Sequence, residues 1–163
     1  LASKMDTLAE EPLEWHFMGN LQSNKINKLI ELSPDLVQSI SSLELALEMQ
    51  KRLEAKNSTF NALLQINSAD EESKGGVSVD SAYDIYQAIQ EQCPNIFLQG
   101  VMSIGAHSEE KALIQKSFER THSVYENLQK EGATICSMGM SSDYDLAIRC
   151  GSNMIRLGSV LFK

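Results

Sequence analysis

The feature that most constrains the fold is a regular alternation of strand-like and helix-like runs along the whole chain. Six short apolar runs are strand candidates, and most of them lack the strict apolar–polar alternation of a half-exposed strand. They cover residues 13–18, 36–40, 60–67, 96–104, 134–138 and 154–157. Such runs are typical of strands that are buried on both faces of a parallel sheet.

The segments between these runs carry helical signals. Apolar residues at spacings of three and four predict an amphipathic helix between residues 114 and 128. A similar pattern over residues 82–89 follows Asp80, which we expect to cap that helix. Ser41 and Glu44 fit a capping box, which predicts that a further helix begins there.

Successive strand candidates lie one βα unit apart, so the sequence predicts an α/β fold with a parallel sheet, either doubly wound or a barrel. A complete barrel of eight units usually needs about 250 residues, whereas this chain has 163. Six units therefore indicate most of a (β/α)8 TIM barrel, from its third to its eighth strand, in a single domain over residues 1–163. The chain begins at Leu1 within a helix-like run, so we expect the N-terminal part of the domain to be missing.

Two turns rich in glycine and hydroxyl residues follow the last two strand candidates, at residues 137–143 and 154–159. Glycine lets the backbone approach an anion, and a helix N-terminus presents unpaired N–H groups. Barrels frequently bind phosphate after their seventh and eighth strands. The turns therefore predict a site for a small phosphorylated ligand, with ordinary strand-to-loop turns as the alternative.

Charge and cysteine content exclude several classes of function. The formal charge of −8, without a basic cluster, argues against non-specific binding to nucleic acid or to an anionic membrane. The odd number of cysteines rules out a complete disulfide framework, so we expect a cytoplasmic protein. No ligand set for a metal is visible around these cysteines, or around His107 and His122.

Three motifs together resemble the YggS-type (PROSC-type) pyridoxal-phosphate homeostasis proteins. Residues 15–25, WHFMGNLQSNK, are similar to the WHFIGxLQxNK signature of that family. Residues 137–143, SMGMSSD, and 155–162, IRLGSVLF, resemble its closing signature. Gln65-Ile66-Asn67, followed by Glu72-Ser73-Lys74-x-Gly76, matches its middle loop. The resemblance covers essentially the whole chain.

The resemblance implies a barrel of the alanine racemase N-terminal type that binds pyridoxal 5′-phosphate. Members of the family look like carriers that influence vitamin B6 and amino-acid balance without robust catalytic activity. Carried over by position, Ser141 and the backbone of Gly158 and Ser159 would hold the phosphate, with Ser137 as a weaker candidate. Arg156 would face the pyridine nitrogen.

The chain departs from the family pattern in one respect. The family's Schiff-base lysine, in a VSKxxP setting, and its FGENYxQE motif have no counterpart here, so we expect that lysine upstream of Leu1. Lys74 is a remote candidate for contact with the aldehyde, and a solvated loop lysine is the alternative. As partners we expect the cofactor and pyridoxal-phosphate-dependent enzymes, but neither nucleic acid nor membrane. The resemblance implies a monomer for the intact family, with a dimer or chain complementation as the alternative for this fragment.

A phosphate-binding or pyridoxal-phosphate-dependent barrel enzyme, such as an amino-acid racemase, is the alternative function. A racemase needs its lysine and a second acid–base group, and an isomerase or aldolase needs a lysine or glutamate at a strand end. None of the six strand ends shows such a residue convincingly. His16 lies between Trp15 and Phe17 on a strand, which favours a packed or hydrogen-bonded histidine over a base.

Overall fold

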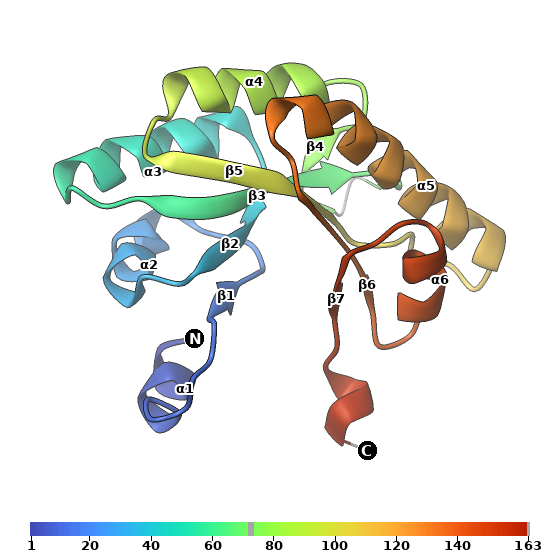
Figure 1. The fold of residues 1–163 in the computed structure, drawn as a ribbon, viewed down its shortest axis with the longest axis horizontal. Helices are drawn as coiled ribbons and strands as arrows, with labels where there is room; N and C mark the ends of the chain where they lie inside the picture. The colour runs from blue at the N-terminus through green and yellow to red at the C-terminus, as the bar shows by residue number, and fades with distance from the viewer. Residues whose placement is uncertain (72–73, 163) are drawn as a thin grey trace.

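The computed structural model describes residues 1–71 and 74–162 and contains one curled, wholly parallel sheet (Figure 1). The strands are β1 (His16–Phe17), β2 (Leu36–Ile40), β3 (Phe60–Asn67), β4 (Val77–Ser78), β5 (Ile96–Ser103), β6 (Ile135–Met140) and β7 (Met154–Arg156). Their order across the sheet is β1-β2-β3-β5-β6-β7, and the short β4 pairs with β3. Among the described residues, β1 and β7 therefore form the two ends of the sheet.

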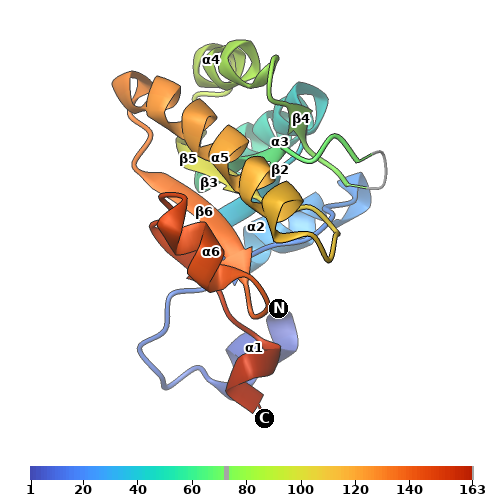
Figure 2. The same cartoon turned by 90° about the vertical axis from the view of Figure 1, so that its right-hand side faces the viewer.

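Helices cover the convex face of the sheet, as two perpendicular views show (Figures 1 and 2). The α-helices are α1 (Ala2–Thr7), α2 (Ile26–Leu32), α3 (Leu43–Ala55), α4 (Ala82–Gln92), α5 (Lys111–Leu128) and α6 (Tyr144–Arg149). Three 3₁₀ segments are η1 (Ser23–Lys25), η2 (Gln129–Glu131) and η3 (Ser159–Phe162). Helix α1 and η3 project beyond the two ends of the sheet. None of the described helices combines the length and the apolar character that crossing a membrane requires.

The sheet buries apolar side chains on both faces, because successive residues of a strand point to opposite sides. On β3, Leu64 belongs to the large cluster that the sheet forms with the helices, together with Met49 of α3 and Phe118 of α5. Leu63 belongs instead to a small separate cluster on the concave side, together with Met102. This two-sided burial explains why the strand sequences lack clean alternation.

The structure confirms the predicted fold class and all six predicted strands. The first is much shorter than expected, because only His16–Phe17 of the run 13–18 pairs with a neighbour. The sequence did not predict β4, because a strand of two residues is too short to show a periodic pattern. The helix predicted over 114–128 forms within Lys111–Leu128, and that over 82–89 within Ala82–Gln92.

Two capping predictions are wrong by one residue each. Ser42 rather than Ser41 caps α3, since its backbone is extended and its Oγ accepts a hydrogen bond of 3.1 Å from the N–H of Leu45. The residue before α4 is Ser81 rather than Asp80, and its side chain makes no cap hydrogen bond. The hydroxyl of Ser81 lies 2.7 Å from that of Ser78 instead, so the turn after β4 is held by two serines.

Candidate functional site

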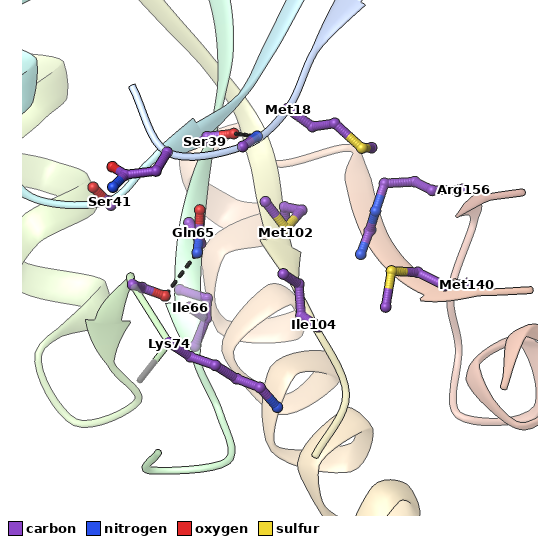
Figure 3. Close-up of a pocket in the computed structure, with 13 residues that line it drawn as sticks. Met18, Ser39, Ser41, Gln65, Ile66, Lys74, Met102, Ile104, Met140 and Arg156 are labelled. Carbon is purple, nitrogen blue, oxygen red and sulfur yellow. Dashed lines mark hydrogen bonds between the residues drawn. The ribbon is translucent and has the colours of Figure 1, made fainter. Parts of the chain in front are cut away.

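The carboxyl ends of the strands surround a cavity of about 440 Å³ (Figure 3). Parallel strands end at the same edge of a sheet, and in barrels this edge carries the functional site. The lining comes from the ends of six strands or the loops that follow them: Met18, Gly19, Asn20, Ser39, Ser41, Gln65, Ile66, Lys74, Gly75, Met102, Ile104, Met140 and Arg156. Most of these side chains are apolar or neutral and polar.

A second, more open hollow of about 730 Å³ adjoins this cavity and shares Met18, Met140 and Arg156 with it. It is lined by the turns after β6 and β7, which are residues 140–142 and 157–159, and by His16 and Gln38 on the opposite flank of the sheet. The two glycine-containing turns are therefore neighbours in space, as the sequence predicts, because β6 pairs with β7.

Arg156 projects from β7 toward the middle of the cavity (Figure 3). Its Nη1 donates a hydrogen bond of 2.8 Å to Ser137 Oγ, and its Nη2 donates one of 2.8 Å to the carbonyl oxygen of Ser103. Burial lowers the pKa of the Arg156 guanidinium, and the carboxylate of Asp143 opposes this shift. Arginine nevertheless stays charged at ordinary pH. Arg156 thus offers the cavity a positive charge anchored to two other strands.

Ser141 lies where two backbone N–H groups converge. Its Oγ accepts hydrogen bonds from the N–H of Gly158 at 3.1 Å and from that of Val160 at 3.4 Å. A Cβ added at Gly158 would meet no atom within 4 Å, so the space beside this backbone is open. These amides occupy the lone pairs of Ser141 Oγ, so its hydroxyl proton is left to donate to an anionic oxygen in the open space.

Gly139, which the sequence predicts in the other turn, lies within β6 and has a different role from the expected one. Its φ is +95°, and a Cβ there would lie 2.6 Å from the Cβ of Ala147 and 3.0 Å from the Cα of Tyr144. The glycine is buried under α6. It therefore permits close packing of α6 on β6 and does not open the backbone to an anion.

The loop after β3 is attached to the strand by two amide side chains. Asn67 Nδ2 donates to the carbonyl oxygens of Glu71 at 3.0 Å and Lys74 at 3.3 Å, and Gln65 Nε2 donates to that of Gly75 at 2.7 Å. Gly76 has a φ of +125°, and a Cβ there would lie 2.9 Å from backbone atoms of β3. These contacts explain most of the middle-loop motif. Its residues Glu72 and Ser73 lie outside the described residues.

Lys74 is not the solvated lysine that the sequence suggested as the simpler alternative. Its Nζ donates to Glu71 Oε1 at 2.9 Å and to the carbonyl oxygen of Gly105 at 2.6 Å, and only 16% of its side chain is exposed. The hydrogen bond from Lys74, together with one from the backbone N–H of His107, lowers the pKa of the Glu71 carboxyl. The side chain of Lys74 reaches the cavity wall with its ammonium group already paired.

The segment Trp15 to Lys25 holds the short β1 against β2. The backbone N–H of Trp15 donates to Asp35 Oδ2 at 2.6 Å, and that of Gly19 donates to Ser39 Oγ at 2.9 Å. The Nδ1 of His16 lies 3.1 Å from Gln38 Nε2, which confirms a hydrogen-bonded histidine. The motif thus places Met18 and Gly19 on the cavity wall.

The predicted site residues do not all lie on the cavity surface. Ser141, Arg156, Gly158 and Ser159 line the open hollow together. Ser137 lines neither cavity: it is fully buried beneath Arg156 and bonded to it. Sequence reasoning missed Gln38 and Ser103, although both are polar residues inside apolar strand runs, a pattern that signals a hydrogen-bonded interior.

Comparison with known proteins was consistent with this geometry. Residues 9–163 match a family described as alanine racemase, N-terminal domain. A protein of Helicobacter pylori named pyridoxal phosphate homeostasis protein is 49% identical over 163 residues. The match covers 100% of this chain and 72% of that protein.

Solved structures show the same fold. PipY of Synechococcus elongatus without pyridoxal phosphate is 30% identical with a TM-score of 0.87, covering 99% of this chain and 77% of that one. With pyridoxal phosphate bound, the values for PipY are 29%, 0.83, 99% and 76%. An alanine racemase of Clostridium difficile, 16% identical with a TM-score of 0.76, covers 99% of this chain and 43% of that one and shows the fold alone. The chain belongs to the alanine racemase N-terminal domain family, and within it to the pyridoxal phosphate homeostasis proteins.

Proposed function

We propose that this chain binds pyridoxal 5′-phosphate and serves as a non-catalytic carrier of it in vitamin B6 and amino-acid balance. The observation that carries the proposal is the convergence of the Gly158 and Val160 N–H groups on Ser141 Oγ, beside open space at Gly158. Both lone pairs of this hydroxyl are used by the amides, so its proton is available to a phosphate oxygen. The bound form of PipY supports the same ligand class.

The assignment of residues follows from this donor set. Ser141 and the backbone of Gly158 and Ser159 hold the phosphate, and Arg156 faces the pyridine ring from the adjoining cavity wall. Arg156 has five N–H donors, and the two atoms Nη1 and Nη2 each use one in the hydrogen bonds described above. Ser137 acts beneath Arg156 as its hydrogen-bond partner, so we assign it to the site without direct contact with the phosphate.

The lining of the cavity suits retention of the ligand better than acid–base chemistry. When bound, pyridoxal phosphate supplies a reactive aldehyde and a ring that withdraws electrons. A cationic arginine beside the ring nitrogen disfavours protonation of that nitrogen, which weakens the electron withdrawal. The ionisable residues in the cavity lining are Lys74 and Arg156, and both are engaged in hydrogen bonds.

The proposal also covers the setting of the protein. We regard residues 1–163 as one barrel domain working in the cytoplasm, with pyridoxal-phosphate-dependent enzymes as recipients of the cofactor. The thiols of Cys93, Cys136 and Cys150 are free, and burial raises the pKa of the Cys136 thiol to about 12, so this thiol is unreactive. Free thiols are what a reducing compartment maintains.

Titration of the chain with pyridoxal phosphate and with phosphate-free pyridoxal tests the proposal. Ser141→Ala removes one hydrogen bond to the phosphate, so we expect its affinity for pyridoxal phosphate to fall about tenfold. Its affinity for pyridoxal should not change. Cofactor absorbance and fluorescence report the binding.

Ser58→Ala is the matched control, because this serine lies before β3, at the opposite end of the strand from the cavity. It should bind both ligands like the unsubstituted chain. An equal loss of both ligands in Ser141→Ala would contradict the phosphate assignment. Amino-acid racemisation by the loaded chain, well above that of free pyridoxal phosphate, would contradict the carrier role.

A further inference from the structure

We propose that Gln38 is a positioning residue for the cofactor site, which orients the hydroxyl of Ser137 and thereby aims the guanidinium of Arg156 at the ring. The inference rests on the proposed function, and it concerns a residue that no motif of the chain includes. Gln38 lies on the wall of the open hollow, but with only 1% of its surface exposed it offers the ligand almost no direct contact. It acts through a chain of hydrogen bonds.

Gln38 reaches across the concave side of the sheet. It lies on β2, is 1% exposed, and makes contacts with residues 99 and 116 positions away in the sequence. Its Oε1 accepts a hydrogen bond of 2.7 Å from Ser137 Oγ on β6, and its Nε2 donates one of 3.5 Å to Met154 Sδ on β7. Nε2 also lies 3.1 Å from His16 Nδ1 on β1. One amide thus connects the two flanks of the curled sheet.

The direction of the Ser137 hydroxyl follows from these contacts. A serine hydroxyl has one proton and two lone pairs. The proton is used by Gln38 Oε1, so a lone pair faces Arg156 Nη1, which is a donor at 2.8 Å. If the amide were reversed, its NH₂ group would face Ser137, so the serine oxygen would lie between two donors and its proton would lose its acceptor. Met154 Sδ, which has no proton to donate, favours the orientation with Nε2 toward it, and His16 Nδ1 accepts from Nε2 in the tautomer that leaves Nδ1 unprotonated.

The network leaves Arg156 with two anchors. Nη1 is held by Ser137 and Nη2 by the carbonyl oxygen of Ser103 on β5. Two anchors fix both the position and the plane of a guanidinium, because its donors form a rigid fork. One anchor leaves it free to rotate about the remaining bond. Gln38 therefore determines where the other N–H groups of Arg156 point.

An apolar side chain would be the ordinary occupant of this position. Leu36, two residues earlier on the same face of β2, packs in the small concave cluster with Leu63 and Met102. A buried amide is costly unless all of its groups are paired, and both ends of Gln38 have partners. Gln38 lies one layer above the apolar cluster. At this layer the interior changes from apolar packing to hydrogen-bonded polar side chains that support the ligand site.

Three variants separate positioning from general stability. Gln38→Leu removes the acceptor for Ser137, Gln38→Glu retains it, and Gln50→Leu makes the same change at a buried glutamine on α3 that bonds Asn95. We expect Gln38→Leu to weaken binding of both pyridoxal phosphate and pyridoxal about fivefold to tenfold. Binding of inorganic phosphate should not change. Gln38→Glu should stay within about twofold of the unsubstituted chain, and Gln50→Leu should change none of the affinities.

Nuclear magnetic resonance of the ligand-free chain gives a readout that does not depend on cofactor binding. The Arg156 side-chain N–H signals should broaden or shift in Gln38→Leu and remain in place in Gln50→Leu.

The outcomes are distinct. If the unsubstituted chain binds no pyridoxal phosphate, the proposed function fails, while the ligand-free spectra still decide the role of Gln38. Unchanged Arg156 signals in Gln38→Leu, or an equal loss in Gln50→Leu, would overturn the positioning role. If Gln38→Leu does not fold, Ser137→Ala replaces it, because it removes the same link between Gln38 and Arg156. It should then shift or broaden the Arg156 signals, and unchanged signals would overturn the positioning role.

Discussion

Gly139 lies within β6 and Gly158 follows β7, the strand paired with it, and the space around each glycine decides its role. Gly139 is packed against Ala147 and Tyr144 of α6, whereas nothing lies within 4 Å of a Cβ placed at Gly158. The first therefore sets the distance between a strand and a helix, and the second leaves room for a ligand. The same residue type in one signature thus packs against a helix at one position and borders open space at the other.

This difference predicts unequal costs for two glycine substitutions. Gly132 has a φ of +92° with nothing within 4 Å, so Gly132→Ala bears only the backbone cost of about 1–2 kcal/mol. Gly139→Ala adds a steric overlap with α6 to a φ of +95°, and should lower the free energy of unfolding by about 1–3 kcal/mol more. Urea denaturation of both variants measures the difference. Equal losses would show that α6 can move away without cost.

At the scale of elements, hydrogen bonds attach the described residues of the loop after β3 to its neighbours in the cavity wall. Asn67 and Gln65 bind its backbone, and Lys74 connects it to the loop after β5 through Gly105. Glu71 completes the connection, because its Oε1 accepts from both Lys74 Nζ and the backbone N–H of His107. The two loops should therefore behave as one unit.

The hydrogen bonds that connect these two loops through Glu71 should depend on pH in a defined direction. The pKa of Glu71 lies below its ordinary value of 4.5, chiefly through the hydrogen bond from Lys74 and then through that from His107. A lowered pKa means that the contacts are complete above the ordinary value and are lost as pH falls through the lowered one. The chemical shift of the His107 amide should therefore titrate with a midpoint below 4.5.

Glu71→Gln is the control for this titration, since it keeps an acceptor and removes the ionisable group. The low-pH transition of the His107 amide should then disappear. In a chain that keeps Glu71, Lys74→Met should shift the midpoint of the transition upward, because it removes the largest cause of the lowered Glu71 pKa. A midpoint at or above the ordinary carboxyl pKa in the unsubstituted chain would contradict the described hydrogen bonds of Glu71.

For the whole molecule, the two faces of the sheet separate stability from binding. The convex face packs against helices and carries most of the core, whereas the concave face supports the cavity (Figure 1). Met49 is fully buried on the convex side, and Met102, 2% exposed, lies on the concave side and lines the cavity. Both are buried methionines, one on each side of the sheet, so the effects of their substitutions can be compared directly.

Alanine substitutions at these two methionines should have different effects on binding. Met49→Ala should lower the free energy of unfolding by about 2–5 kcal/mol without changing the affinity of the folded chain for pyridoxal phosphate. Met102→Ala should also destabilise the chain, and in addition it should change that affinity, because it enlarges the cavity. Calorimetric unfolding combined with ligand titration tests the pair. A changed affinity in Met49→Ala would show that the faces are coupled.

The sequence was sufficient to predict every described strand except the short β4, together with the main helices and the adjacency of the two glycine- and hydroxyl-rich turns. Apolar runs such as 60–67 and the helical spacing over 114–128 are local signals, and local signals survive without knowledge of partners. Cap positions were less certain, since Ser41 and Ser42 both satisfy the pattern and only backbone geometry selects Ser42.

The features of the site also divide into those that the sequence predicts and those that depend on the tertiary structure. The sequence by itself determined that Ser141, Arg156 and Gly158 lie on adjacent strand ends, because their motif spacing and the βα repeat require it. Only the tertiary structure decided that Gln38 supports this site, since the curl of the sheet brings β2 to within hydrogen-bonding distance of β6. Pairing between side chains so far apart in the chain depends on how the strands close around the interior, and no local pattern of residues records that closure.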